Sequence, residues 1–532
     1  MSMKFSIILK ALLPVLGAVA FCGVGSAEKL VILHTNDTHS TIDPMADGTG
    51  GVLQRKAVID SVKKVEKNVI LVDAGDVVQG SLFFKYFHGD VEYPLMDMMG
   101  YDIRILGNHE FDNGVESLAH YYKKTKGTPL AVNYDFSGTE LDGIFKPYAI
   151  REVDGKKIGF IGVGLDPASI ISQKNFGGNF IEVIPIVNET AAKLKNEEGC
   201  DLVVVVTHLG YRKVNEKTSD QELAAASKDI DLIIGGHTHT LIDPEHPEIN
   251  SSLFENSEGM LVRIAQSGKQ GQYLGKLTID LDQLPLVSGE QIKYELIPVT
   301  DRFSEDLLDK EMSDFIKPFR EAVDSINNVV IAYSEYDLLK TRTGGLANLT
   351  ADIGYIYGQN MVDSLNKAGN NLQDVDLAIM NVGGIRHDMH KGVITEGQIL
   401  STYPFSNKFV IIEVKGKDII EAMRVSAMKG GEAISSNLRV VTDPMGNLKR
   451  VIINGEEMDP EKEYIISTID YIAEGNDDLL SLANHKKIWV SDDEVAFPIL
   501  RWIKKQHKNG LTIAPDQGSR FVVDIADQVI DN

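Results

Sequence analysis

The sequence has very little cysteine. Its 532 residues include only Cys22 and Cys200, and Cys22 lies in an N-terminal segment that we expect to be removed. The mature chain then has one thiol, which excludes an internal disulfide and argues against a thiolate-ligated structural zinc site. A chain of this length can bury enough apolar surface without disulfides, so Cys200 is interpreted as a small buried residue.

Positive charge is also scarce. Lys and Arg number 53 against 77 Asp and Glu, which gives a net charge of −24. Phosphate backbones bind basic surfaces, so this balance argues against a nucleic-acid polymer as the main partner. A small anionic substrate stays compatible with it, because bound cations reverse the local field.

Long apolar runs are missing except at the N-terminus. There, Lys4 and Lys10 precede an apolar segment from Ala11 to Cys22, and Gly25-Ser26-Ala27 follows. This pattern is typical of a secretory signal peptide, which we place at residues 1–27. We expect a periplasmic or secreted protein with no stable membrane insertion after cleavage. An uncleaved anchor helix is the alternative.

Residues 28–300 alternate short apolar runs with helical stretches. Runs rich in β-branched residues and bounded by polar residues or Gly predict strands buried on both faces. Five such runs are Leu30–Leu33, Val69–Val72, Ile158–Ile161, Leu202–Val206 and Leu232–Ile234. Residues 53–67 and 190–197 are predicted helices between them. The alternation predicts an α/β layered domain.

A different pattern begins at Ser304. This residue is a plausible N-cap, and apolar residues from Leu307 to Val323 recur at helical spacing around Pro318. We interpret residues 301–328 as a linker helix, with an ordinary helix of the first domain as the alternative. Residues 329–532 are predicted to form a second, α+β domain.

Residues that can bind metal ions follow four of the predicted strands of the first domain and the short run Arg104-Ile105-Leu106. The clusters are Asp37-Thr38-His39, Asp73-Ala74-Gly75-Asp76, Gly107-Asn108-His109-Glu110, Thr207-His208 and Gly235-Gly236-His237-Thr238-His239. Ligand sites in α/β sheets gather at the carboxyl ends of strands. In an extended segment Asp37 and His39 point to the same side, so both could bind one ion. Asp76 is the candidate for a carboxylate that bridges two metals, and Asp73 either supports the site or caps a turn.

The type of ligand indicates the type of metal. Asp, Asn and His without Cys form an oxygen and nitrogen set, which suits Zn, Mn or a similar divalent ion in an open catalytic site.

These motifs resemble the calcineurin-like metallophosphoesterases. They are most similar to the bacterial 5′-nucleotidase branch, which includes UDP-sugar hydrolases and 2′,3′-cyclic phosphodiesterases. The resemblance covers essentially the whole mature chain. It implies an α/β layered metallophosphoesterase sandwich (α/β/β/α) followed by a C-terminal α+β 5′-nucleotidase domain that binds the nucleotide.

The resemblance also implies two divalent metal ions and a catalytic dyad. One ion would be held by Asp37, His39, Asp76 and His239, and the other by Asp76, Asn108, His208 and His237. Many relatives have Gln or Asn where His239 stands. The dyad would be His109 and Asp112. His109 would either neutralise charge on the phosphoryl group together with Asn108 or protonate the leaving oxygen. Asp112 would orient the His109 imidazole.

Loop residues of the second domain suit a nucleotide. A Gly pair precedes Arg386, which can bind an anion through two hydrogen bonds. Phe405 and Tyr471 lie in predicted loops and could stack on a base, and Asp477 could accept hydrogen bonds from ribose. A role in the core or in a turn is the alternative for each.

The resemblance assigns these loop residues more specific roles. It implies that Phe405 and Tyr471 clamp the base, that Asn407 contacts the base and Asp477 the ribose, and that Asn381 and Arg386 hold the polar end of the substrate.

Three positions depart from the family pattern. Lys340 stands where Arg is usual, and a Lys ammonium lacks the planar fork that fits phosphate; Arg342 could compensate. Thr343 and Asp478 replace a usual Glu and a usual Gly. These departures leave the identity of the nucleotide open, but not the metal chemistry.

The combined prediction is an exported phosphoesterase with two metal ions that hydrolyses nucleoside 5′-monophosphates by metal-activated hydroxide. The first alternative is a UDP-sugar or 2′,3′-cyclic-nucleotide phosphodiesterase that uses the same site. The second is a non-catalytic exported protein that binds a nucleotide or a metal. The sequence predicts no oligomeric state.

Overall fold

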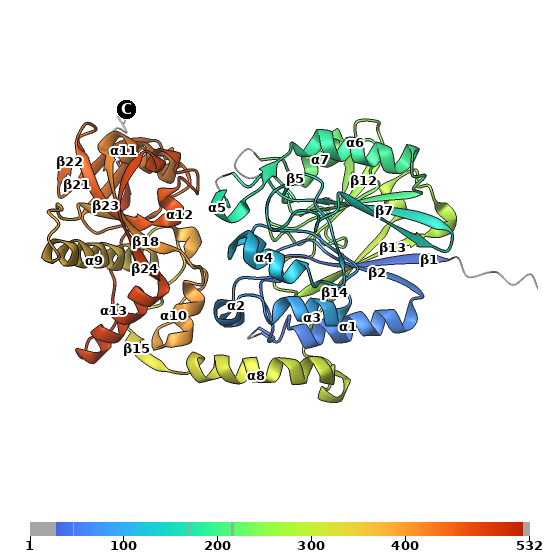
Figure 1. Ribbon diagram of the computed structural model, residues 1–532, viewed down its shortest axis with the longest axis horizontal. Coiled ribbons are helices and arrows are strands. Elements are labelled where there is room, and N and C mark those ends of the chain that lie inside the picture. The colour runs from blue at the N-terminus through green and yellow to red at the C-terminus, as the bar shows by residue number, and fades with distance from the viewer. Residues whose placement is uncertain (1–27, 46, 169, 172, 214–216, 525–532) are drawn as a thin grey trace, which may run out of the picture.

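Figure 1 shows the computed structural model, which describes residues 28–524 except residues 46, 169, 172 and 214–216. The signal peptide predicted for residues 1–27 lies outside the described residues. Two α/β units lie side by side, and helix α8 (Lys310–Asn327) leads from the N-terminal unit to the C-terminal one. Within the described part of the chain, no helix has both the length and the apolar character needed to cross a membrane.

The N-terminal unit contains two six-stranded sheets, with the strand orders β14-β13-β1-β2-β3-β4 and β11-β12-β10-β9-β7-β6. The strands of the first sheet are β1 (Lys29–Thr35), β2 (Asn68–Asp73), β3 (Ile103–Arg104), β4 (Thr128–Pro129), β13 (Tyr273–Asp280) and β14 (Lys293–Pro298). Those of the second are β6 (Tyr148–Val153), β7 (Lys156–Val163), β9 (Leu202–Thr207), β10 (Leu232–Ile234), β11 (Leu253–Glu255) and β12 (Leu261–Ala265). Strands β1, β2 and β3 are parallel, as are β7, β9 and β10.

Strand β1 shows why the unit is layered. Its side chains alternate between two cores: Leu30 and Ile32 pack between the sheets, while Val31 and Leu33 pack with helices α1 (Val52–Val65) and α3 (Glu92–Met99). Helices α6 (Val183–Asn196) and α7 (Asp220–Ala226) cover the outer face of the second sheet. The order helix, sheet, sheet, helix confirms the predicted sandwich (Figure 1).

The five predicted strands are confirmed as β1, β2, β7, β9 and β10. The predicted helix at 190–197 is the C-terminal part of the longer helix α6. Its first turn contains Pro185, which is tolerated there because the missing N–H has no partner within the helix.

The prediction that Ser304 caps the long helix is wrong. Ser304 precedes a short 3₁₀ turn (Glu305–Leu307), and α8 begins only at Lys310. Asp309 is the actual cap, since its side chain accepts a hydrogen bond from the backbone N–H of Met312 (2.9 Å).

The C-terminal unit contains a five-stranded sheet, a four-stranded sheet and a two-stranded pair. Their strand orders are β19-β16-β23-β18-β24, β22-β21-β20-β25 and β15-β17. The strands are β15 (Val330–Ser334), β16 (Leu377–Met380), β17 (Gly392–Thr395), β18 (Lys408–Lys415), β19 (Ala433–Ile434), β20 (Leu438–Thr442), β21 (Leu448–Ile453), β22 (Glu456–Glu457), β23 (Glu463–Ile469), β24 (His485–Glu494) and β25 (Phe521–Val523). The main helices are α9 (Gly345–Lys367), α10 (Glu396–Thr402), α11 (Gly416–Met428) and α13 (Ala496–Lys508). Domain boundaries near residues 300 and 329 stay a prediction.

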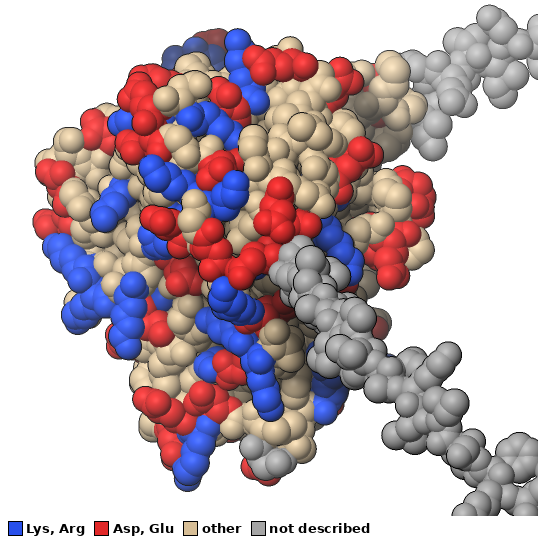
Figure 2. All heavy atoms as spheres, turned by 90° about the vertical axis from the view of Figure 1, so that its right-hand side faces the viewer, with Lys and Arg blue, Asp and Glu red and all other residues tan. Residues whose placement is uncertain are grey.

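The two units share packed surface. One apolar core runs from α1 and α3 through α8 into the C-terminal unit, and the rings of Phe87 and Phe319 meet at the junction with centroids 4.8 Å apart. The opposite end of the N-terminal unit faces the viewer in Figure 2. On this face the described Lys and Arg side chains are interspersed with Asp and Glu (Figure 2).

Candidate active site

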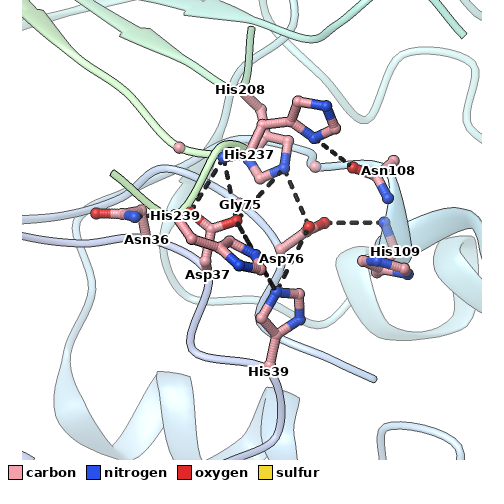
Figure 3. Close-up of polar contacts among 12 residues, drawn as sticks. Asn36, Asp37, His39, Gly75, Asp76, Asn108, His109, His208, His237 and His239 are labelled. Carbon is pink, nitrogen blue, oxygen red and sulfur yellow. Dashed lines mark hydrogen bonds and ion pairs between the residues drawn. The ribbon is translucent and has the colours of Figure 1, made fainter. Parts of the chain in front are cut away.

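Loops at the carboxyl ends of the parallel strands of both sheets meet at one place (Figure 3). The loops after β1, β2 and β3 come from the first sheet, and those after β9 and β10 from the second. Together they bring the seven predicted metal ligands into one cluster: Asp37, His39, Asp76, Asn108, His208, His237 and His239.

The prediction that the segment from Asp37 to His39 is extended is wrong. Asp37 has φ 51° and His39 has φ 46°, so both are left-handed. They belong to a tight turn in which their backbone N–H groups donate to the carbonyls of Gly75 (2.9 Å) and Asp76 (3.0 Å). Asp76 also has a positive φ, of 57°. Such conformations cost on the order of 1–3 kcal/mol each and gather at functional sites.

The carboxylates and imidazoles converge closely. Asp76 Oδ2 lies 3.1 Å from His208 Nε2 and 4.0 Å from His39 Nε2. Asp37 Oδ1 lies 3.5 Å from His239 Nε2 and 3.8 Å from His208 Nε2. Two groups, Asp37 with His39 and His239, and Asp37 with Asp76 and His208, have ligand atoms within 4.8 Å of one another.

Asn108 and His237 are in direct contact at the edge of this cluster. Asn108 Oδ1 lies 3.0 Å from His237 Nδ1. The backbone N–H of His237 donates to both oxygens of Asp37, at 3.1 and 3.0 Å. Asn108 and His237 are therefore anchored beside Asp37 and can add an amide oxygen and an imidazole nitrogen to the ligand set.

The chemistry of the cluster fits divalent cations. His208 Nδ1 donates to the carbonyl of Ala74 (2.7 Å), and Nε2 on the other side of the ring faces the carboxylates. His39 Nδ1 is buried without a hydrogen-bond partner. Burial lowers the pKa of His237 to about 3 and that of His239 to about 4, so both imidazoles are neutral, as metal ligands must be.

The charge of His208 supports the same interpretation. Burial lowers the pKa of His208, but the carboxylates of Asp76 and Asp37 outweigh burial and raise it to about 10. His208 thus carries positive charge that balances two buried carboxylates. A divalent cation would supply that charge instead.

His109 and Asp112 form the predicted pair. His109 Nδ1 lies 3.0 Å from Asp112 Oδ2, and the backbone N–H of His109 donates to Asp76 Oδ1 (2.9 Å). Burial lowers the pKa of His109, but the charges of Asp112 and Asp76 outweigh it, so the net shift is upward. His109 Nε2 is left to hold a proton toward the cavity.

Glu110 supports the cluster, although the sequence predicted no role for it. Its buried carboxylate accepts hydrogen bonds from the backbone N–H groups of Asp76 (3.0 Å), Val77 (2.8 Å) and Gly107 (2.7 Å). It therefore joins the loop of Asp76 to the loop of Asn108. Its place directly after His109, in the segment Gly107–Glu110, was the available signal. Asp73 caps a turn by accepting from the N–H of Gly75 (3.0 Å).

Two glycines permit the close approach of these loops. A Cβ at Gly107 would lie 2.2 Å from Asp76 Oδ1, and a Cβ at Gly236 would lie 2.7 Å from His208 Nδ1. No side chain fits at either position without displacing a candidate ligand.

A cavity of about 840 Å³ lies between the two units and contacts the cluster. From the N-terminal unit it is lined by Asp76, Asn108, His109, Asp112, His237 and His239. From the C-terminal unit it is lined by Asn381, Arg386, Phe405, Asn407, Tyr471 and Asp477. Six of the eight predicted substrate residues therefore face the predicted metal site.

Phe405 lies directly against the dyad. Its ring stacks on His109 with centroids 5.8 Å apart, and the Arg386 guanidinium lies 5.6 Å from the Phe405 centroid. In the same cavity, the Tyr471 hydroxyl lies 3.3 Å from Asp477 Oδ1, and Asn381 Nδ2 donates to Asp477 Oδ2 (3.1 Å).

Lys340 and Arg342 are not among the described residues that line the cavity. The Arg342 guanidinium donates to the carbonyl of Gly431 (3.4 Å). Partial burial and the charges of Arg386 and Lys269 lower the pKa of Lys340 to about 8, so its ammonium lies near Arg386.

Two protein families match this chain, one in each unit. Residues 30–241 match the model for calcineurin-like phosphoesterases, and residues 330–483 match the model for the 5′-nucleotidase C-terminal domain. The chain belongs to the 5′-nucleotidase family. Families of this type are phosphoric ester hydrolases, and calcineurin-like phosphoesterases bind divalent metals. The resemblance predicted from the motifs is therefore confirmed.

Two of three relatives of this 5′-nucleotidase family member match it over nearly their whole length, and the third is much longer. The 5′-nucleotidase of Vibrio cholerae is 27% identical over 531 residues, which cover 91% of this chain and 93% of that protein. The trifunctional nucleotide phosphoesterase YfkN of Bacillus subtilis is 28% identical over 74% of this chain, but the match covers only 27% of YfkN. The crystal structure of a 5′-nucleotidase precursor from Thermus thermophilus has 27% identity and a TM-score of 0.75, and the match covers 93% of this chain and 99% of that one.

Proposed function

We propose that this protein is an exported 5′-nucleotidase that hydrolyses nucleoside 5′-monophosphates with the help of two divalent cations such as Zn or Mn. The observation that carries the proposal is the shared cavity. One wall presents a metal-ligating cluster and a His–Asp pair, and the other presents aromatic and hydrogen-bonding side chains suited to a nucleoside.

The proposed ligands divide around Asp76. Asp37, His39, Asp76 and His239 would hold one cation, and Asp76, Asn108, His208 and His237 the other. When bound, such cations provide a water of lowered pKa as the nucleophile and neutralise charge on the phosphoryl oxygens.

His109 moves the proton at the leaving group. The carboxylate of Asp112 holds Nδ1 and favours the charged imidazolium, so Nε2 carries a proton toward the cavity. Transfer of that proton to the departing ribose oxygen avoids an alkoxide. The positive charge of His109 also stabilises the negative phosphoryl oxygens before transfer.

The C-terminal unit orients the nucleoside. Phe405 and Tyr471 provide aromatic surface for the base, Asn407 contacts the base edge, and Asp477 accepts hydrogen bonds from ribose hydroxyls. Arg386 and Asn381 bind the polar end of the substrate. Fixing a substrate in this way removes much of the entropic barrier to the reaction.

Export is part of the proposal. The charge and apolar pattern of residues 1–27 supports cleavage after Ala27 and a periplasmic or secreted location. N-terminal sequencing of the protein from its own cell envelope or medium tests this. A mature N-terminus at Glu28 is expected, and an intact N-terminus at Met1 would contradict it.

The test of activity is kinetics with metal-reconstituted protein on a substrate panel. AMP and UMP are expected to have the highest kcat/KM, above UDP-glucose, 2′,3′-cyclic AMP and bis(p-nitrophenyl) phosphate. Asp76→Asn should lower kcat/KM for AMP by about 100-fold or more, whereas Asp60→Asn on the exposed face of α1 should not. A preference for a diester or for UDP-glucose would contradict the monophosphatase assignment.

A further inference from the structure

Lys85 is a buried cation of the N-terminal unit whose partners all belong to the C-terminal unit. It lies on the short helix α2 (Leu82–Phe87), which follows the Asp76 loop and faces the C-terminal unit at the junction (Figure 1). Its side chain is only 5% exposed. A buried ammonium is costly unless charged or polar groups surround it.

Two acceptors satisfy this ammonium. Lys85 Nζ forms an ion pair with Glu494 and donates a hydrogen bond to the backbone carbonyl of Phe405 (3.2 Å). The ring of Phe497 lies beside it, with its centroid 6.0 Å from Nζ. Phe405 and Glu494 are 320 and 409 residues away in sequence.

The two acceptors are parts of one structure. Glu494 ends β24, and the next residue, Val495, donates its backbone N–H to the carbonyl of Asn407 (2.8 Å). Lys408 pairs with Glu494 where β18 begins. Lys85 therefore holds the loop from Phe405 to Asn407 at the point where it enters the sheet.

We propose that Lys85 is a positioning residue that fixes the Phe405–Asn407 loop against the metal-binding unit, so that the base-binding surface is assembled only when the two units are docked. The inference rests on the proposed function, because it assigns Phe405 and Asn407 to the base. It also explains the stacking of Phe405 on His109: the backbone that carries the ring is fixed from the same unit as His109.

Substrate kinetics separate a positioning role from a merely structural one. Lys85→Met and Glu494→Gln are each expected to raise KM for AMP about tenfold, because the base site is no longer preorganised. The kcat/KM for p-nitrophenyl phosphate, which has no base, should change less than about twofold. The double variant should raise KM no further than the larger single effect, since both changes remove one interaction.

Lys276→Met is the matched control. Lys276 is also a partly buried Lys, paired with Glu66 at 2.8 Å, but both residues lie within the N-terminal unit. The KM of Lys276→Met for AMP should equal that of the native protein. Equal losses on AMP and p-nitrophenyl phosphate in the Lys85 and Glu494 variants, or no change on AMP, would overturn the proposal.

Hydrogen exchange of the substrate-free protein tests the same inference without reference to the reaction. The amide of Val495 should exchange at least about tenfold faster in Lys85→Met and in Glu494→Gln than in the native protein. In Lys276→Met its exchange rate should be unchanged. Unchanged exchange in both junction variants would refute the positioning role. Failure of the native protein to prefer AMP over p-nitrophenyl phosphate would instead refute the proposed function.

Discussion

Asp76 is held from every side by the residues that form the site. Its Oδ1 accepts from the backbone N–H of His109, its Oδ2 faces His208, and its carbonyl accepts from His39. Burial raises the pKa of Asp76, but the positive charges of His208 and His109 outweigh burial and lower it well below the ordinary value. The carboxylate therefore stays ionised at neutral pH, as a ligand shared between two cations must.

The His109–Asp112 pair gives a pH-dependence at the residue scale. Asp112→Asn keeps the shape of the side chain but removes the charge that raises the pKa of His109. His109 acts in its protonated form, so activity is lost as pH rises through its pKa. The alkaline limb of kcat for AMP should move to lower pH, and kcat should fall about 100-fold.

Profiles of kcat between about pH 5 and 10 check this prediction, with Asp60→Asn as control. An alkaline limb that stays in place in Asp112→Asn would contradict the role given to the pair.

Gly236 is a second residue with a defined consequence. A Cβ at this position would lie 2.7 Å from His208 Nδ1 and 3.2 Å from Asp37 Oδ2. Gly236→Ala is expected to displace one of these ligands and to lower metal content from two cations per chain to one or none. Elemental analysis of the purified variant measures this. Gly259→Ala is the control, because a Cβ in that turn would lie 3.8 Å from its nearest neighbour, Glu255 Oε1. Full metal content in Gly236→Ala would contradict the geometry.

Five strands of the N-terminal unit could be predicted from the sequence. The strands β1, β2, β7, β9 and β10 were predicted because each is a short β-branched run, and parallel pairing places their carboxyl ends together. The residues that follow β1, β2, β9 and β10 could therefore be grouped in one place from the sequence.

The turns between these elements could not be predicted in the same way. Asp37, His39, Asp76, His237 and His239 all have positive φ, which few non-Gly residues adopt without support from their surroundings. That support comes from segments distant in sequence, such as the Glu110 carboxylate beneath the Asp76 loop. For the same reason no role for Lys85 could be predicted, because its partners are brought to it only by the docking of the two units.

The turn after β16 yields a prediction about stability. The buried carboxyl of Glu432 accepts a hydrogen bond from the backbone N–H of Val382, and burial raises its pKa to about 7. A raised carboxyl pKa gives stability that is present at low pH and is lost as pH rises through the folded value. Glu432→Gln cannot ionise, so its stability relative to the native protein should increase between pH 5 and 8, by at most about 3 kcal/mol.

Thermal or denaturant unfolding at these pH values measures the difference. Glu421→Gln, which removes an exposed partner of Arg424, should show no comparable pH-dependent gain. A constant difference between Glu432→Gln and the native protein across this range would show that Glu432 does not titrate as described.

At the scale of the whole molecule, the metal cluster is also a source of stability. Asp37, Asp76 and His208 are buried together, and cations that bind only the folded chain stabilise it by mass action. Removal of metal with a chelator should lower the free energy of unfolding by about 3 kcal/mol when free cation had been near 100 times its Kd. Adding Zn or Mn should restore the melting temperature, and Mg at the same concentration should restore less, since imidazole ligands suit Zn and Mn better.

Metal binding and substrate orientation depend on different parts of the molecule. The cavity exists only where the two units meet, so its two walls are held by one continuous core and by contacts such as that of Lys85 with Glu494. Substrate orientation thus depends on docking, whereas the metal ligands all lie within the N-terminal unit.

Anomalous diffraction from crystals of the Mn-loaded protein tests directly whether Asp76 lies between two cations. We expect two anomalous peaks per chain, one on each side of Asp76, with Asp37, His39 and His239 around one and Asn108, His208 and His237 around the other. A single peak that Asp76 does not contact, or peaks elsewhere in the molecule with this cluster empty, would contradict that arrangement.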